Sequence, residues 1–82
     1  MRFKNEELVK SWILNFNNNG SNHNKSLVLK DGRLYTYNVL LAYFKDGNLF
    51  LNSNRYSNTS SRHRNLVRKY AEYKSINIIE YK

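Results

Sequence analysis

Near the N-terminus, five apolar side chains recur at the spacing of one helix face: Leu8, Val9, Trp12, Ile13 and Phe16. Asn5 can cap such a helix, and the helix dipole favours Glu6 and Glu7 in the first turn. We therefore predict a helix over about residues 6–17, followed by a polar loop over residues 18–25.

After Ser26 the apolar residues recur at the spacing of strands, and we predict four of them: 27–29, 34–37, 39–44 and 49–51. Asp31-Gly32 and Asp46-Gly47 are signals for two-residue hairpin turns. At Tyr37-Asn38 the chain either bends or continues as one long strand with a bulge. Residues 26–52 are therefore expected to form a meander of three or four antiparallel strands.

A polar connector, residues 53–58, leads to a second predicted helix over about residues 60–73, which Thr59, Ser60 or Ser61 can cap. The apolar stripe of this helix comprises Leu66, Val67, Tyr70 and Ala71. A β-branched and aromatic segment, residues 76–81, then predicts a last strand that returns to the sheet.

These elements predict one α+β domain over residues 1–82, in the order α-β-β-β-β-α-β. We expect an antiparallel sheet of four or five strands, with both helices packed on one face. The alternative, with one helix on each face, would divide few apolar residues between two cores.

The composition narrows the class of protein. Fourteen Lys and Arg against six Asp and Glu give a net charge of +8, and the chain has no Cys. No apolar run approaches the roughly 20 residues of a membrane span, and the N-terminus lacks the apolar core of a signal peptide. The abundance of Asn, Lys, Tyr, Phe and Ile, which have AT-rich codons, favours a low-GC bacterium or its phage as the source. We expect a basic protein in the cytoplasm of the host bacterium.

Catalytic chemistry has little support in the sequence. The acidic residues lie at a helix start, in turns or late in the chain, and no pair has the spacing of an acid–base couple. Two His residues without Cys do not suggest a metal site, and no Gly-rich phosphate loop is present. We predict that the protein is not an enzyme and needs no cofactor or metal.

His63 allows two interpretations, because it falls on the apolar side of the second helix. It is either a partly buried structural side chain that bonds to the polar connector, or a general base or nucleic-acid contact. A small nuclease or hydrolase that uses His63 would be the enzymatic version of the second.

The main functional signal is positive charge near the second helix. Residues 51–82 hold seven Lys and Arg against two Glu, a net +5, whereas residues 1–50 have a net +3. By helical projection, Arg64 and Arg68 point away from the apolar stripe. This surface is either a binding face for phosphate or carboxylate groups or an ordinary solvated helix face. The candidate binding residues are Arg55, Tyr56, Arg62, Arg64, Arg68, Lys69 and Lys74.

Several short segments in the middle of the chain together form a recognisable pattern: Leu34-Tyr35-Thr36-Tyr37, Leu41-Ala42, Asp46-Gly47, Asn52 and 56–63. They resemble a widespread group of small phage-encoded proteins of unknown function, whose pattern is a "LYSYGT-IA" strand, a hairpin and "YS-TTS-HQ" at a helix start. The resemblance covers roughly residues 5–70. Asn38 stands where the pattern has Gly, and Arg64 where it has Gln.

The resemblance implies a phage or mobile-element origin, and small phage proteins often block host machinery, including CRISPR effectors. We therefore expect a non-enzymatic binding protein that inhibits a host nucleoprotein defence complex, in the manner of an anti-CRISPR protein. Its basic surface would engage nucleic acid or the effector nuclease. The alternative is a protein–protein adaptor or homo-oligomeric phage accessory protein, such as a homodimer, with no nucleic-acid role.

Overall fold

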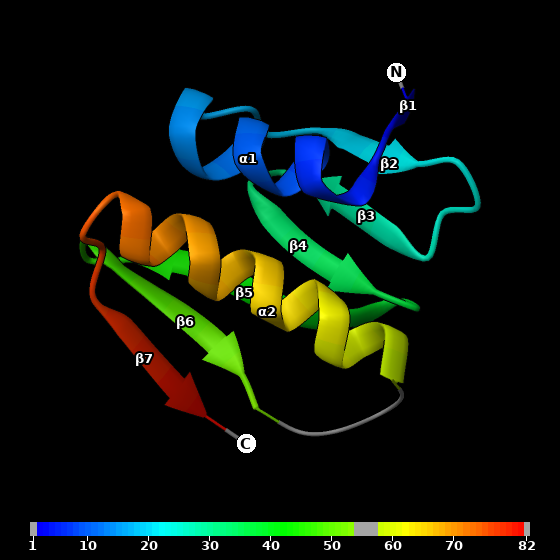
Figure 1. The fold of residues 1–82 in the computed structure, drawn as a ribbon. Coiled ribbons are helices and arrows are strands. Elements are labelled where there is room, and N and C mark those ends of the chain that lie inside the picture. The colour runs from blue at the N-terminus through cyan, green and yellow to red at the C-terminus, as the bar shows by residue number, and fades with distance from the viewer. Residues whose placement is uncertain (1, 54–57, 82) are drawn as a thin grey trace.

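The computed structural model describes residues 2–53 and 58–81 of the 82-residue chain (Figure 1). Within these residues, two helices accompany one mixed sheet of seven strands, whose spatial order follows their order in the sequence. In chain order the elements are β1 (Arg2–Phe3), α1 (Asn5–Asn15), β2 (Gly20–Asn22), β3 (Leu27–Lys30), β4 (Arg33–Thr36), β5 (Val39–Lys45), β6 (Asn48–Asn52), α2 (Asn58–Tyr73) and β7 (Ile78–Tyr81).

The α+β class is confirmed, whereas the predicted strand count and element order are wrong. Two short strands were missed, β1 before the first helix and β2 inside the predicted loop. The sheet is also not wholly antiparallel, because β1 pairs with β2, and β6 with β7, in parallel. A helix connects the strands of each parallel pair and returns the chain to the same end of the sheet.

The strands β3 to β6 form the predicted meander, and three two-residue turns connect them. The turns are Asp31-Gly32, Tyr37-Asn38 and Asp46-Gly47, and all six residues have positive φ, as type I′ turns require. The chain therefore bends at Tyr37-Asn38. A register shift between Leu34 and Tyr35 also makes a bulge between β4 and β5, at a different place from the one considered.

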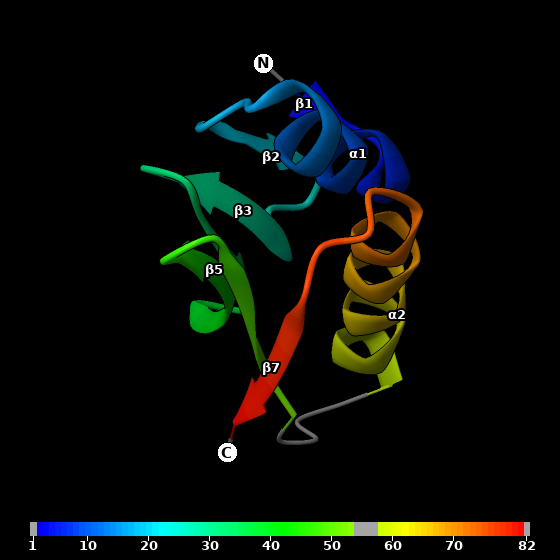
Figure 2. The same cartoon turned by 90° about the vertical axis from the view of Figure 1, so that its left-hand side faces the viewer.

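Both helices cover the same face of the sheet, as predicted (Figure 2). Buried residues from α1, α2 and the strands form one apolar core between these layers. Trp12 also ties α1 to the first hairpin turn, because its Nε1 donates a hydrogen bond to the carbonyl oxygen of Gly32 at 3.1 Å. Within the described residues, no helix is long and apolar enough to cross a membrane.

The start of α1 differs from the expected cap. Lys4 is the N-cap residue, and its backbone N–H donates to the Oε1 of Glu7 at 3.3 Å. Asn5 is already helical, and its side chain accepts a hydrogen bond from Asn22 at 2.7 Å. The capping prediction is therefore wrong, because a tertiary partner on β2 uses the Asn5 amide.

Candidate nucleic-acid interface

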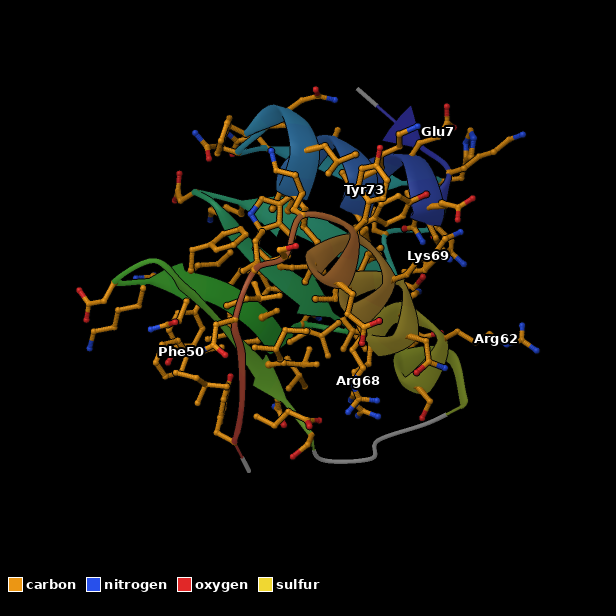
Figure 3. All side chains as sticks on the ribbon, turned by 60° about the vertical axis from the view of Figure 1, so that its left-hand side comes forward. Glu7, Phe50, Arg62, Arg68, Lys69 and Tyr73 are labelled. Atoms are coloured by element: carbon orange, nitrogen blue, oxygen red, sulfur yellow. The ribbon has the colours of Figure 1, made fainter. Side chains whose placement is uncertain are left out.

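The basic residues predicted to bind a partner are placed differently along α2. Arg55 and Tyr56 lie outside the described residues. Arg62 is exposed on the first half of the helix, and none of the ion pairs formed by the described residues involves it (Figure 3).

Arg64 points inward, so its predicted outward position is wrong. Only 6% of its surface is exposed, and its Nε donates a hydrogen bond to the carbonyl oxygen of Asn52 at 3.0 Å. Asn52 is the last residue of β6, and its carbonyl oxygen lies beneath the first turns of α2. The guanidinium of Arg64 turns toward the sheet because this oxygen accepts its hydrogen bond. Arg64 therefore attaches α2 to the sheet and does not form part of an open basic face.

Arg68 and Lys69 reach solvent, but each has an acidic partner on a neighbouring element. Arg68 pairs with Glu80 of β7, and the Nζ of Lys69 lies 2.8 Å from the Oε2 of Glu6 on α1. The hydrogen bond from Lys69 lowers the pKa of Glu6 below its ordinary value. Much of the charge predicted for this helix face is thus compensated within the molecule.

His63 is fully buried between α2 and the sheet. Its Nδ1 lies 2.9 Å from the Oγ1 of Thr36, and its Nε2 lies 3.3 Å from the Nδ2 of Asn5. These partners lie on β4 and α1 instead of the expected connector. The geometry supports the structural interpretation of His63, since a fully buried ring has no access to a substrate.

The hydrogen-bond network around His63 fixes the proton position on its ring. The backbone N–H of Leu27 donates to the Oδ1 of Asn22 at 3.1 Å, so the Nδ2 of Asn22 must donate to Asn5. The Nδ2 of Asn5 then donates to the Nε2 of His63, and the Nδ1–H of His63 donates to Thr36. Burial lowers the pKa of His63 below its ordinary value, which keeps the ring neutral as this network requires.

The opposite face of the sheet is covered by neither helix (Figure 2). Leu34 and Thr36 are buried toward the helices, so the alternation of β4 directs Arg33 and Tyr35 to the open face. Phe50, between two buried leucines of β6, also lies on this face, opposite the basic residues of α2 (Figure 3). We call this surface the open face.

One row of paired residues crosses the open face over five strands. Lys30 of β3 pairs with Arg33, and Arg33 pairs with Tyr43 of β5. Tyr43 pairs with Phe50, which in turn pairs with Ile79 of β7. Two cations are therefore followed by two aromatic rings and one aliphatic side chain along a single line.

The aromatic side chains of the open face form a cluster. The rings of Tyr43 and Phe50 are stacked, with centroids 5.2 Å apart and planes 6° from parallel. Tyr81 contacts Tyr43 in a tilted arrangement at 6.0 Å. Tyr35 lies on the next strand of the same face, so the cluster presents rings to solvent across four strands.

Among the side chains that the structure describes, the strand positions of the open face contain cations but no acidic group. By alternation and pairing, the described residues at these positions are Ser21, Val28, Lys30, Arg33, Tyr35, Leu40, Tyr43, Lys45, Asn48, Phe50, Asn52, Ile79 and Tyr81. Asp31 and Asp46 lie in the turns at one end of the surface. Such a face complements an anionic ligand.

A hollow of about 690 Å³ lies on this face, between the first hairpin turn and β5. It is lined by Asp31, Gly32, Arg33, Tyr35, Leu40, Tyr43, Phe44, Lys45 and Tyr81. Its size falls within the range of small-ligand pockets, roughly 300–1,000 Å³. The hollow thus combines apolar rings, two cations and one carboxylate.

The last predicted binding residue, Lys74, lies at a different hollow near the end of α1. Its Nζ lies 5.7 Å from the ring centroid of Phe16, a side chain that is 78% exposed. This mainly apolar hollow has a volume of about 390 Å³ and is lined by Ile13, Phe16, Phe44, Gly47, Lys74 and Ile76. It is better suited to apolar contact than to phosphate binding.

Within the part of the chain that the structure describes, no three His, Cys, Asp or Glu side chains come together to hold a metal ion. No protein-family model, no curated protein and no solved structure matches the chain. The resemblance to small phage proteins therefore stays a prediction.

The open face was missed in the sequence, although its signal is present there. Tyr35 alternates with Leu34 and Thr36, and Phe50 alternates with Leu49 and Leu51. This alternation identifies an aromatic surface only once both helices are known to lie on the other side.

Proposed function

We propose that the protein binds single-stranded nucleic acid through the open face. The observation that supports this proposal best is the row from Lys30 and Arg33 to Tyr43 and Phe50. Proteins that bind single strands combine two features: cations that contact the phosphates and aromatic rings on which the bases stack. The described strand positions of this face have no acidic side chain, so the face does not repel the negatively charged phosphates of a nucleic acid.

A single strand fits this surface better than a duplex does. The bases of a duplex stack on one another, whereas those of a single strand can stack on protein rings. The rings of Tyr43, Phe50 and Tyr81 lie within 6.0 Å of their neighbours and form a platform instead of a protruding wedge or helix. Contacts between the cations and the phosphate backbone of the nucleic acid then supply the affinity, and stacking of bases on the rings supplies the preference for single strands.

This proposal moves the main contact surface from α2 to the sheet. Arg64 is buried, and Arg68 and Lys69 are paired with glutamates, so α2 offers less uncompensated charge than its sequence suggests. Arg62 remains an exposed cation on the helix side and provides a direct comparison between the two surfaces.

The biological setting that we propose is inhibition of a nucleoprotein defence complex in the cytoplasm of a bacterial host. The support for it is the resemblance of roughly residues 5–70 to small phage proteins. A protein of this kind would act without catalysis, by occupying the guide or target strand of a CRISPR-type effector. The open face is the surface that we assign to this contact.

Fluorescence anisotropy with a labelled single strand and the matching duplex tests the proposed function. We expect the single strand to bind more tightly, with an affinity that falls steeply as salt increases. Tyr43→Leu keeps an apolar side chain but removes the ring, and it should weaken binding about fivefold or more, since stacking is worth roughly 1–3 kcal/mol per base. Binding that is equal for both ligands and insensitive to Tyr43→Leu would contradict the proposal.

A second candidate function, a protein–protein adaptor, is favoured by the apolar hollow around Phe16. A largely exposed Phe beside an apolar concavity is typical of a protein contact. Light scattering distinguishes the candidates. A salt-insensitive oligomer that Phe16→Ser dissociates, together with no nucleic-acid binding, would favour the adaptor.

A further inference from the structure

The hollow on the open face has the size and lining of a site for one nucleotide. Phe50 stacks on the Tyr43 ring, and Tyr43 also lines the hollow, whereas Phe50 does not. A planar base that enters the hollow would therefore extend an existing stack of two rings. Tyr35 and Tyr81 line the same space and would flank that base.

Two cations of the hollow are placed to hold the phosphate of the same nucleotide. Arg33 is the direct cross-strand neighbour of Tyr43, and Lys45 follows Tyr43 by two residues on the same face of β5. Both line the hollow. An Arg fork together with a Lys ammonium is a common arrangement for phosphate oxygens.

Asp31 is the one acidic side chain that lines the hollow, among the residues that the structure describes. It belongs to a well-anchored turn. The backbone N–H of Asp31 donates to the Oδ1 of Asn19 at 3.3 Å, and that of Gly32 donates to the carbonyl oxygen of Asn18 at 3.0 Å. An anchored carboxylate accepts two parallel N–H donors well. Of the four bases, guanine presents two such neighbouring donors, its ring N–H and its exocyclic amino group.

We infer that this hollow recognises a guanine nucleotide within a single strand, with the base stacked on Tyr43, its N–H edge on Asp31 and its phosphate between Arg33 and Lys45. This inference rests on the proposed function, since it assigns a base preference to the same surface. It goes beyond that function in making the contact sequence-dependent.

The test uses the full chain and two single-stranded oligomers that differ at one position, guanosine or inosine. Inosine lacks only the exocyclic amino group. We expect the guanosine oligomer to bind about fivefold or more tightly, because a bidentate base contact is worth roughly 1–3 kcal/mol. Asp31→Asn should bring this ratio close to one, and Asn remains compatible with the positive φ of residue 31.

The matched control is Asp46→Asn, which makes the same change in the second Asp-Gly turn, where Asp46 does not line the hollow. It should leave the guanosine-to-inosine ratio unchanged. A ratio near one in the unaltered protein, or an equal loss in both variants, would overturn the base assignment while the proposed function stands. If neither oligomer binds, the proposed function itself fails.

Discussion

Folding stability should depend on pH through His63, a buried titratable group at the centre of the polar network. The ring accepts from Asn5 at Nε2 and donates to Thr36 from Nδ1, so the folded protein holds it neutral. Burial lowers its folded-state pKa below the ordinary 6.5. The unfolded chain therefore takes up a proton first as the pH falls. The contribution of the neutral His63 to stability is therefore complete above about pH 6.5 and is lost as the pH decreases toward the folded-state pKa.

The size of this effect has an upper limit. Each pH unit below the ordinary pKa of 6.5 lowers the free energy of unfolding by at most about 1.4 kcal/mol. Between about pH 8 and about pH 5 the loss is therefore no more than about 2 kcal/mol for one histidine. Glu6, whose pKa is lowered from 4.5, loses its contribution only at lower pH, so it does not obscure this range.

Urea denaturation at several pH values measures this dependence, with His63→Leu as the test variant. The variant should remove most of the pH dependence between about pH 8 and pH 5. If it fails to fold because Thr36 and Asn5 lose their partner, His63→Leu combined with Thr36→Val also replaces the buried hydroxyl and gives a second chance to measure the slope. An identical pH dependence in the unaltered protein and a folded variant would refute the assignment of a neutral, buried His63.

Two further pairs of variants test contacts of the fold. Gly32 and Gly47 both have positive φ, but their surroundings differ. A Cβ at residue 32 would lie 3.3 Å from the Oδ1 of Asn18, whereas a Cβ at residue 47 would have no neighbouring atom within 4 Å among the described residues. Thermal denaturation should therefore show that Gly32→Ala costs more than Gly47→Ala, where the backbone penalty alone is about 1–2 kcal/mol; equal losses would contradict the close approach. Arg64→Met should lower the free energy of unfolding by about 1.5–3 kcal/mol, because it removes a charged donor to a buried carbonyl. Arg62→Met should change it by less than about 0.5 kcal/mol, and similar losses in both would show that Arg64 is not buried as described.

The hairpins and helices could be predicted because their signals are local. The two Asp-Gly pairs form the expected turns, and the apolar stripe of Leu8, Val9, Trp12 and Ile13 faces the core. By contrast, β2 comprises Gly20–Asn22, which has no apolar alternation and becomes a strand only by pairing with its neighbours.

The candidate site was harder to predict, because it depends on tertiary packing. Helical projection places Arg64 outward, but the carbonyl of Asn52 lies beneath it and accepts its hydrogen bond. Similarly, the charges of Arg68 and Lys69 are visible in the sequence, while their acidic partners lie on other elements. The open face follows from strand alternation only when the position of both helices is known.

The open face, and not α2, is the surface that we propose to contact nucleic acid. Arg33→Glu and Arg62→Glu make the same charge change at exposed arginines on the two surfaces. The measurement is the dissociation constant for one labelled single strand, taken for both variants at the same low salt concentration. We predict that Arg33→Glu weakens binding about tenfold or more and that Arg62→Glu has a much smaller effect. An equal or larger loss with Arg62→Glu would contradict the account.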